Sequence, residues 1–356
     1  MPLPFLAVAA IGVGLTGLFK GGQAVSNNSK ANDLLESAER KYNNAKSDLE
    51  EQKEKTVAEL DALGKTMLTS WSHDIGGFLP LFNSFKKVQI ENSANLNLKL
   101  KDQISDPRVL KNMNVASMKA TEVLGSGVGA LGAGALAGIA SYGGAMMFAS
   151  ASTGTAIATL SGAAATNATL AWFGGGSLAA GGLGVAGGTI VLGGVVAAPV
   201  LAVAGFIMAA KSEEKLAQAE KAYSEANNAA AKMETMTSAL QAIYDLANLD
   251  NSFIAQYSRQ YQKMLVQLKA VHDEAYTKQE KLFGNRIRKI FGMKIKVDYR
   301  LLTDCQKDAL HLAWLMTQIL YGTLTTPILS KNGDLNPEAH DKLYALKGES
   351  QKYLEA

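Results

Sequence analysis

Residues 31–71 read ANDLLESAERKYNNAKSDLEEQKEKTVAELDALGKTMLTSW, and this stretch decides the class of fold. Its apolar or small residues recur at steps that mostly alternate between three and four, which draws a single stripe along an α-helix. The acidic and basic residues between them form a solvated face. The stripe runs through Ala31, Leu35, Ala38, Tyr42, Ala45, Leu49, Thr56, Leu60, Leu63 and Met67, with Gln52 in its one polar gap. This spacing predicts a long, coiled-coil-like helix.

A second charged stretch begins after Lys211 and repeats this pattern. Its stripe consists of Leu216, Ala219, Tyr223, Ala226, Ala230, Met233, Leu240 and Ala247. The residues from Phe253 to about Phe283 have the same periodicity and predict a further helix.

Helix breakers punctuate the sequence that follows the first long helix. Two glycines and Pro80 within residues 71–81 predict that the helix breaks there, and the apolar residues of 82–90 predict a shorter helix after the break. A further helix is expected to begin near Asn112 and to run on into uncharged sequence.

The C-terminal region carries two helix-start signals. Thr303 and Gln306 are spaced as a capping box, in which each residue bonds the other's backbone, for an apolar helix that ends before Pro327. The threonines of this helix favour a soluble core helix over a membrane span. Pro337 stands where the first position of a last helix is expected.

The charge-free block, Val123 to Ala210, contains no charged residue and is built mainly from Gly and Ala. It is several times longer than the ~20 residues that suffice to cross a bilayer, so a membrane role is favoured over a buried core. Residues 150–177 are richer in Ser, Thr and Asn. We therefore expect a helical hairpin, with Val123–Ala149 and Leu178–Ala210 as its arms.

Glycines spaced four apart lie on one helix face, where they permit close backbone contact between helices. This spacing occurs in four pairs, and the residues expected to take part in membrane insertion or oligomerisation are Gly17, Gly21, Gly125, Gly129, Gly134, Gly138, Gly184, Gly188, Trp172 and Phe173. Gly and Ala add little transfer free energy, so the arms are only moderately hydrophobic. Two readings stay open: a hairpin held in a soluble state that inserts later, and a permanent anchor.

An internal echo links the two ends of the block. PFLAVA at residues 4–9 resembles PVLAVA at residues 199–204, and each precedes a charged helix with a related tyrosine motif, around Tyr42 in the first and Tyr223 in the second. If the two charged helices are parallel, both apolar segments project from the same end of the body, which predicts one membrane-facing pole.

A basic segment with interleaved apolar residues covers residues 281–300. Basic residues near an anionic lipid surface each contribute ~1 kcal/mol, so the segment is a candidate for headgroup contact, with a solvated loop as the alternative. The residues expected to make this contact are Arg286, Arg288, Lys289, Lys294 and Lys296.

Composition and motifs argue against an enzyme. The net charge of +3 is too small to indicate nucleic-acid binding, and one cysteine, Cys305, can form neither an internal disulfide nor a thiolate cluster. The GVGLTG sequence at residues 12–17 fits a dinucleotide fingerprint, but no βαβ unit follows it. The histidines are scattered, at His73, His272, His311 and His340. We expect no catalytic residue, no cofactor and no metal.

Two long amphipathic helices around a charge-free hairpin resemble the architecture of the long-helix α-pore-forming toxins. That resemblance implies an apolar head that inserts while the helices form the shaft; the secretion signal usual in that family is absent, since residues 1–19 lack a positive n-region and are expected to be retained. Residues 152–187 are also similar to a Gly-rich block of uncharacterised bacterial proteins, some from phage-defence or toxin systems.

The expected fold is therefore all-α: an elongated bundle of long coiled-coil-like helices with a Gly/Ala-rich hairpin. Its expected regions are 1–22, 23–122, 123–210, 211–283 and 284–356. The expected function is permeabilising or remodelling a membrane from the bacterial cytoplasm or inner membrane. Lipids, further copies of the chain and a protein that triggers or restrains insertion are the expected partners; a membrane-anchored scaffold and a soluble homo-oligomer are the alternatives.

Overall fold

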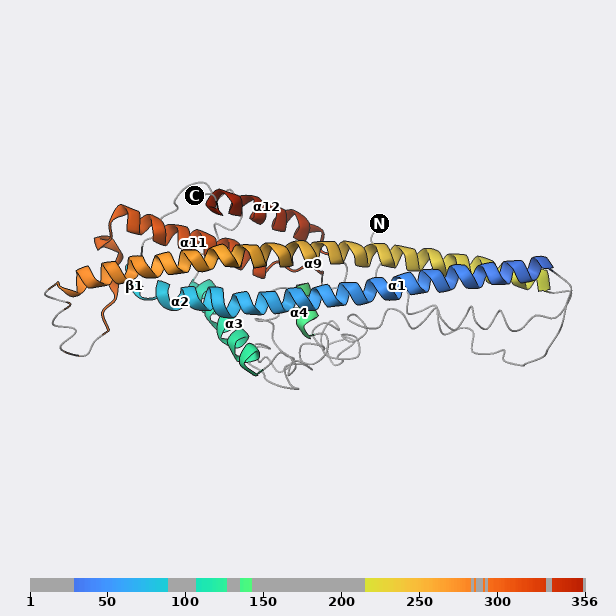
Figure 1. The fold of residues 1–356 in the computed structure, drawn as a ribbon, viewed down its shortest axis with the longest axis horizontal. Coiled ribbons are helices and arrows are strands. Elements are labelled where there is room, and N and C mark those ends of the chain that lie inside the picture. The colour runs from blue at the N-terminus through green and yellow to red at the C-terminus, as the bar shows by residue number, and fades with distance from the viewer. Residues whose placement is uncertain are drawn as a thin grey trace.

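The protein is an elongated all-α molecule built on two long helices packed side by side (Figure 1). The computed structural model describes residues 29–88, 107–126, 135–142, 215–282, 285, 291, 294–330 and 335–354. Most of the charge-free block therefore lies outside the described residues. The expected all-α, elongated fold is confirmed.

The first long helix, α1, spans Ser29–Thr69. The sequence predicts that this helix breaks at the glycines and Pro80. It does not break there but continues through a π-helical turn, η3 (Ser70–Ile75), into α2 (Gly76–Phe82). Trp71, Ile75 and Phe78 on this stretch are fully buried. Tertiary packing of these side chains overrides the local breaker signals, and the wider π turn lies just before the proline.

The second long helix, α9, spans Lys215–Glu280 and runs parallel to α1. Contacts between the two helices advance together along both. Lys41 Nζ donates to Tyr223 Oη at 3.1 Å, and Thr66 Oγ1 donates to Asn251 Oδ1 at 2.7 Å. The two helices therefore point in the same direction along the shaft.

The sequence predicts two helices where α9 is one. The predicted gap lies between Ala247 and Phe253, and the buried position that continues the stripe across it is Asp250, which is 1% exposed. A carboxylate at a core position hides the apolar periodicity, although no Gly or Pro interrupts the helix. The predicted gap was therefore wrong.

A polar layer divides the core of the shaft in two. Near the beginnings of α1 and α9 the core is small and rich in alanine, and it holds Ala38, Tyr42, Ala45, Leu49, Ala226, Ala230 and Met233. Gln52 and Thr56 are buried below it; the Gln52 amide donates to the Thr56 hydroxyl at 3.3 Å, and that hydroxyl donates across to the Leu240 carbonyl at 3.1 Å. Buried polar residues in a coiled-coil seam fix the register of the two helices.

The broad end of the molecule lies beyond this layer, toward the C-terminal end of α9, where shorter helices pack on the shaft (Figure 1). They are α3 (Pro107–Ser126), α11 (Asp304–Leu324) and α12 (Pro337–Leu354). Aromatic side chains join α11 to α2, as where Phe82 stacks on Trp314 with ring centroids 5.0 Å apart. This end contains most of the buried large apolar side chains.

Several boundaries follow the sequence, and others do not. The capping box of Thr303 and Gln306 begins α11, and Pro337 opens α12, as predicted. The helix expected near Asn112 begins earlier, at Pro107, whose ring fits a first helical turn. The short helix expected after Phe82 was wrong for residues 83–88, which contain a turn and the strand β1 (Phe85–Lys86).

Strand β1 pairs in parallel with β2 (Val297–Asp298), at the end of α9. Phe85 lies opposite Val297, and the short 3₁₀ helix η8 (Tyr299–Leu301) follows β2. The Gln279 side chain fixes this corner: its amide nitrogen donates to the Asp298 carbonyl at 3.0 Å, and the Asp298 amide donates to its oxygen at 2.7 Å.

Candidate docking site of the charge-free block

Helix α4 (Ala135–Tyr142) belongs to the first arm of the charge-free block, and it packs directly on α1. The two helices cross at Gly64, so closely that a Cβ added there would lie 2.1 Å from the Leu136 carbonyl oxygen and 2.7 Å from its carbon. No real side chain tolerates such a separation from backbone atoms. Only glycine at residue 64 allows this crossing.

Polar contacts fix both ends of α4. At its beginning, the Asp61 carboxylate accepts a hydrogen bond of 2.8 Å from the Ala137 amide. The first amides of a helix lack partners within the helix, so a carboxylate of α1 caps α4 from outside. Near its end, the Ser141 carbonyl accepts a bond of 2.8 Å from the Leu329 amide.

Buried side chains fill the interface of α4. Ala137, Ile139 and Ala140 are buried, as is Ser141, whose hydroxyl has no hydrogen-bond partner among the described residues. Burying one CH₂ group contributes ~0.8 kcal/mol, so the two alanines add little, and Ile139 with the partly buried Leu136 supplies most of the apolar contact. The contact is specific in shape and modest in hydrophobic free energy.

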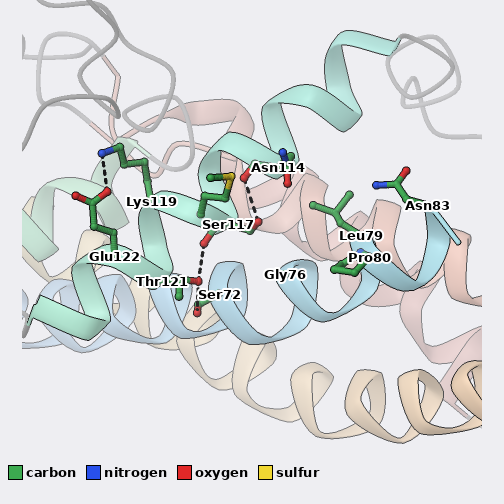
Figure 2. A pocket seen from close by; sticks show the side chains of 11 residues that line it. Ser72, Gly76, Leu79, Pro80, Asn83, Asn114, Ser117, Lys119, Thr121 and Glu122 are labelled. Atoms are coloured by element: carbon green, nitrogen blue, oxygen red, sulfur yellow. Dashed lines mark hydrogen bonds and ion pairs between the residues drawn. The ribbon is translucent and has the colours of Figure 1, made fainter. Parts of the chain in front are cut away.

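Helix α3 carries the chain into the block and lies against η3 and α2. Its buried face consists of Val109, Met113, Ala116 and Ala120. Beside that face runs an open groove of about 760 Å³ (Figure 2). The hydroxyls of Ser72 and Thr121, 2.8 Å apart, bridge the two walls. Figure 2 also shows the ion pair of Lys119 with Glu122, at 2.7 Å, on the α3 side.

The groove holds no pairing of a nucleophile with a base among its lining residues, which are Ser72, Gly76, Leu79, Pro80, Asn83, Asn114, Ser117, Met118, Lys119, Thr121 and Glu122. Its hydroxyls bond to each other or to helix carbonyls: Thr121 Oγ1 donates to the Ser117 carbonyl at 2.8 Å, and Ser117 Oγ to the Asn114 carbonyl at 3.1 Å. These two bonds lie within α3, while the Ser72–Thr121 bond attaches α3 to the shaft.

The two attachments of the block to the described body lie far apart. The shaft register places the start of α9 beside the first turns of α1, whereas α4 crosses α1 at Gly64. About thirty helical residues separate these levels, which at 1.5 Å per residue is ~50 Å. Because α1 and α9 are parallel, both begin at the same end of the shaft (Figure 1). The apolar segments of the internal echo, residues 4–9 and 199–204, lie outside the described residues.

No protein-family model matches the chain. Searches of curated proteins and of solved structures also find no match.

Few of the glycines expected to contact other helices lie within the described residues. Gly138 is buried in α4, whereas Gly125 is exposed at the end of α3, with nothing within 4 Å of an added Cβ. The other residues of that set lie outside the described residues: Gly17, Gly21, Gly129, Gly134, Gly184, Gly188, Trp172 and Phe173. The glycine that makes a close helix contact is Gly64, in a charged helix.

Some of the expected lipid-contact residues lie within the described residues and others do not. Lys294 and Lys296 are exposed just before β2, whereas Arg286, Arg288 and Lys289 lie outside the described residues.

Sequence reasoning missed Gly64 and Asp61. One signal was available: an isolated glycine inside a helix costs ~1 kcal/mol relative to alanine, so Gly64 in the middle of a long stripe needed a reason. Asp61 carries no such signal, because an acidic residue on a solvated helix face is ordinary.

Two features are absent from the part of the chain that the structure describes. In that part of the chain, no helix combines the length and apolarity needed to cross a membrane. No group of three or more His, Cys, Asp or Glu side chains is arranged to hold a metal ion there. His311 is half-buried on α11, with Nε2 2.9 Å from the Tyr299 hydroxyl.

Proposed function

We propose that the protein is a non-enzymatic, membrane-permeabilising or membrane-remodelling effector that stores part of its charge-free block against the helical body and then releases it to a bilayer. The docking of α4 over Gly64 is the observation that carries this proposal. It supports storage because a segment of the block has a shaped, capped seat on a charged helix.

The character of the interface supports release as well as storage. The α4 seat depends on a close approach and on two backbone hydrogen bonds, while its alanines contribute little hydrophobic free energy. Loss of one such contact therefore removes a large share of what holds α4. A segment free of charged side chains can then exchange a protein surface for lipid without burying a charge.

The proposed partners are membrane lipids and further copies of the chain, with bacterial cytoplasm or inner membrane as the proposed location. A hairpin rich in Gly and Ala packs closely against its neighbours in a bilayer, so several copies would define the size of a lesion. A protein that restrains or triggers release would act on α4 or on its seat. A toxin or anti-phage role fits this mechanism.

Dye release from vesicles tests the proposal with the purified full-length chain. The matched control replaces residues 143–210 with a Gly/Ser linker of equal length, whose root-mean-square span of ~45 Å matches the separation of the two attachments. We expect the wild-type chain to release dye under at least one lipid and pH condition, and the control to release none.

Cell fractionation separates this function from its alternatives. A stored block predicts a soluble pool of the wild-type chain as well as a membrane-bound one. A chain found in membranes alone would indicate a permanent anchor. A defined oligomer purified without detergent that never releases dye would indicate a soluble assembly, and either result refutes the proposal.

A further inference from the structure

The corner where β1 meets β2 gathers basic side chains from two distant parts of the chain. Lys86 lies opposite Asp298 in the strand pair, and Lys87 follows it. Lys294, Lys296 and Arg300 flank β2 on the other side and are exposed. The residues we call the basic corner are Lys86, Lys87, Lys281, Lys294, Lys296 and Arg300.

One buried carboxylate organises this corner without neutralising it. Asp298 Oδ2 lies 3.1 Å from Arg300 Nη2, 3.9 Å from Lys86 Nζ and 4.0 Å from Lys87 Nζ. Its hydrogen bond with Arg300 is the main cause that lowers the pKa of Asp298, so it stays ionised. Glu280 is the other acidic residue within 279–301. The corner therefore keeps an excess of positive charge.

Large apolar side chains are exposed in the chain segment that supplies most of these cations. Leu301 is 57% exposed, Phe291 73% and Leu282 48%. They are half of the large apolar side chains that are strongly exposed among the described residues, the others being Met118, Val266 and Tyr344. The hydrogen bonds of Gln279 to Asp298 hold the end of α9, just before Leu282, next to the strand that leads to Leu301.

We propose that the basic corner is a docking surface for an anionic lipid bilayer. Cations at such a surface attract the headgroups, and exposed apolar side chains enter the boundary between headgroups and acyl chains. A surface for nucleic acid would use the charges but would have no use for the exposed leucines. The combination of both side-chain kinds on one fixed corner is what a bilayer surface fits.

This docking step goes beyond the proposed release of the block and is separate from it. The corner lies at the end of α9, and a helix of 66 residues is ~100 Å long, so the corner is remote from the end of the shaft where α1 and α9 begin. Docking would place the stored protein on its target surface before α4 leaves its seat.

Vesicle co-sedimentation tests the corner with the full-length chain. The vesicles are phosphatidylcholine alone, or phosphatidylcholine and phosphatidylglycerol in equal parts. The charge variant combines Lys87→Gln, Lys294→Gln and Lys296→Gln; its matched control replaces three exposed lysines of α9, Lys232, Lys263 and Lys269, with Gln. Each lysine removed should weaken partitioning onto anionic vesicles about 5-fold, so about 100-fold for three, while the control stays close to wild type.

A second pair of variants tests the apolar half of the surface. Leu301→Ser should weaken binding to anionic vesicles several-fold, whereas Val266→Ser, at a similarly exposed residue of α9, should leave it unchanged. Thermal melts of all variants establish that each one is folded.

Several outcomes would overturn docking at the corner. They are equal binding to both vesicle types, equal losses in variant and control, and retention on a soluble polyanion without any vesicle binding. Binding without dye release would refute the proposed function and leave the corner standing. Dye release that is unchanged in the charge variant, without measurable vesicle binding, would refute docking at the corner and leave the proposed function standing.

Discussion

Replacing Gly64 with alanine sets two physical effects against each other. In a helix interior, alanine is more favourable than glycine by ~1 kcal/mol, so α1 alone would be stabilised. In the assembled protein the new Cβ would lie 2.1 Å from the Leu136 carbonyl oxygen, whereas ordinary contact begins near 3.4 Å. The helices must therefore separate by more than an ångström, and overpacking of this kind typically costs 1–3 kcal/mol.

That displacement should appear in α4 and not in the shaft. A shift of this size lengthens the bond from the Ala137 amide to Asp61 and withdraws Ile139 from its contact. We expect hydrogen exchange of the α4 amides to become 5- to 100-fold faster, which corresponds to 1–3 kcal/mol. Hydrogen exchange in the part of α9 that follows Leu240 should change little. Dye release from vesicles should begin at a lower protein concentration.

Gly348→Ala is the matched control, because it lies in α12 with nothing within 4 Å of an added Cβ. It should raise the unfolding temperature and leave α4 exchange and dye release unchanged. If Gly64→Ala behaves like this control, the close crossing does not hold α4 and the reasoning from it fails. Faster α4 exchange without any gain in dye release would show that Gly64 holds α4 in place but that this contact does not control membrane permeabilisation.

Three other perturbations have defined outcomes. Asp61→Ala removes the cap of α4 at a cost of ~1 kcal/mol, so α4 amides should exchange about 5-fold faster, while Asp48→Ala on the exposed face of α1 should have no such effect. Burial raises the pKa of Asp250 well above its ordinary value, so the folded state holds a proton that the unfolded state releases above about pH 4; stability should fall as pH rises toward the folded-state pKa, and Asp250→Asn should abolish this slope and melt higher at neutral pH. Thermal melts of both proteins over a pH series would show it. Replacing the buried pair with Gln52→Leu and Thr56→Val should keep or raise the unfolding temperature but admit other registers of α1 on α9, seen as faster hydrogen exchange of the amides around the layer; exchange as slow as in the wild type would contradict a register role for the layer.

The long-helix architecture could be predicted because its signal is local and repeated. Positions of the α1 stripe such as Ala38, Leu49 and Met67 are buried, since a period near 3.6 places them on one face whatever they pack against. The capping box at Thr303 is equally local. Where core packing competes with local chemistry, the sequence misleads, as at Pro80 within a continuing helix and at Asp250 inside the core.

The docking seat could not be predicted, and the basic corner only in its segment 281–300, because the rest depends on which distant segments meet. Gly64 is informative only once Leu136 lies against it, and Lys86 only once β1 pairs with β2. The periodicity of one helix describes its own faces and does not name the residues that will cover them. A lone glycine inside a charged helix is locally unfavourable, and such a residue can mark a close contact with a distant segment.

The parallel pairing of α1 and α9 also dictates the order in which the chain can fold. Contacts such as Lys41 with Tyr223 and Thr56 with Leu240 join residues 182 and 184 positions apart. A chain synthesised at roughly 5–20 residues per second completes the first helix many seconds before its partner leaves the ribosome. The uncharged sequence emerges in that interval, ahead of the helix that completes the body. A nascent chain of this protein therefore meets cellular membranes and chaperones with its apolar segment synthesised and its shaft unfinished, and contacts of such long range also make for slow folding.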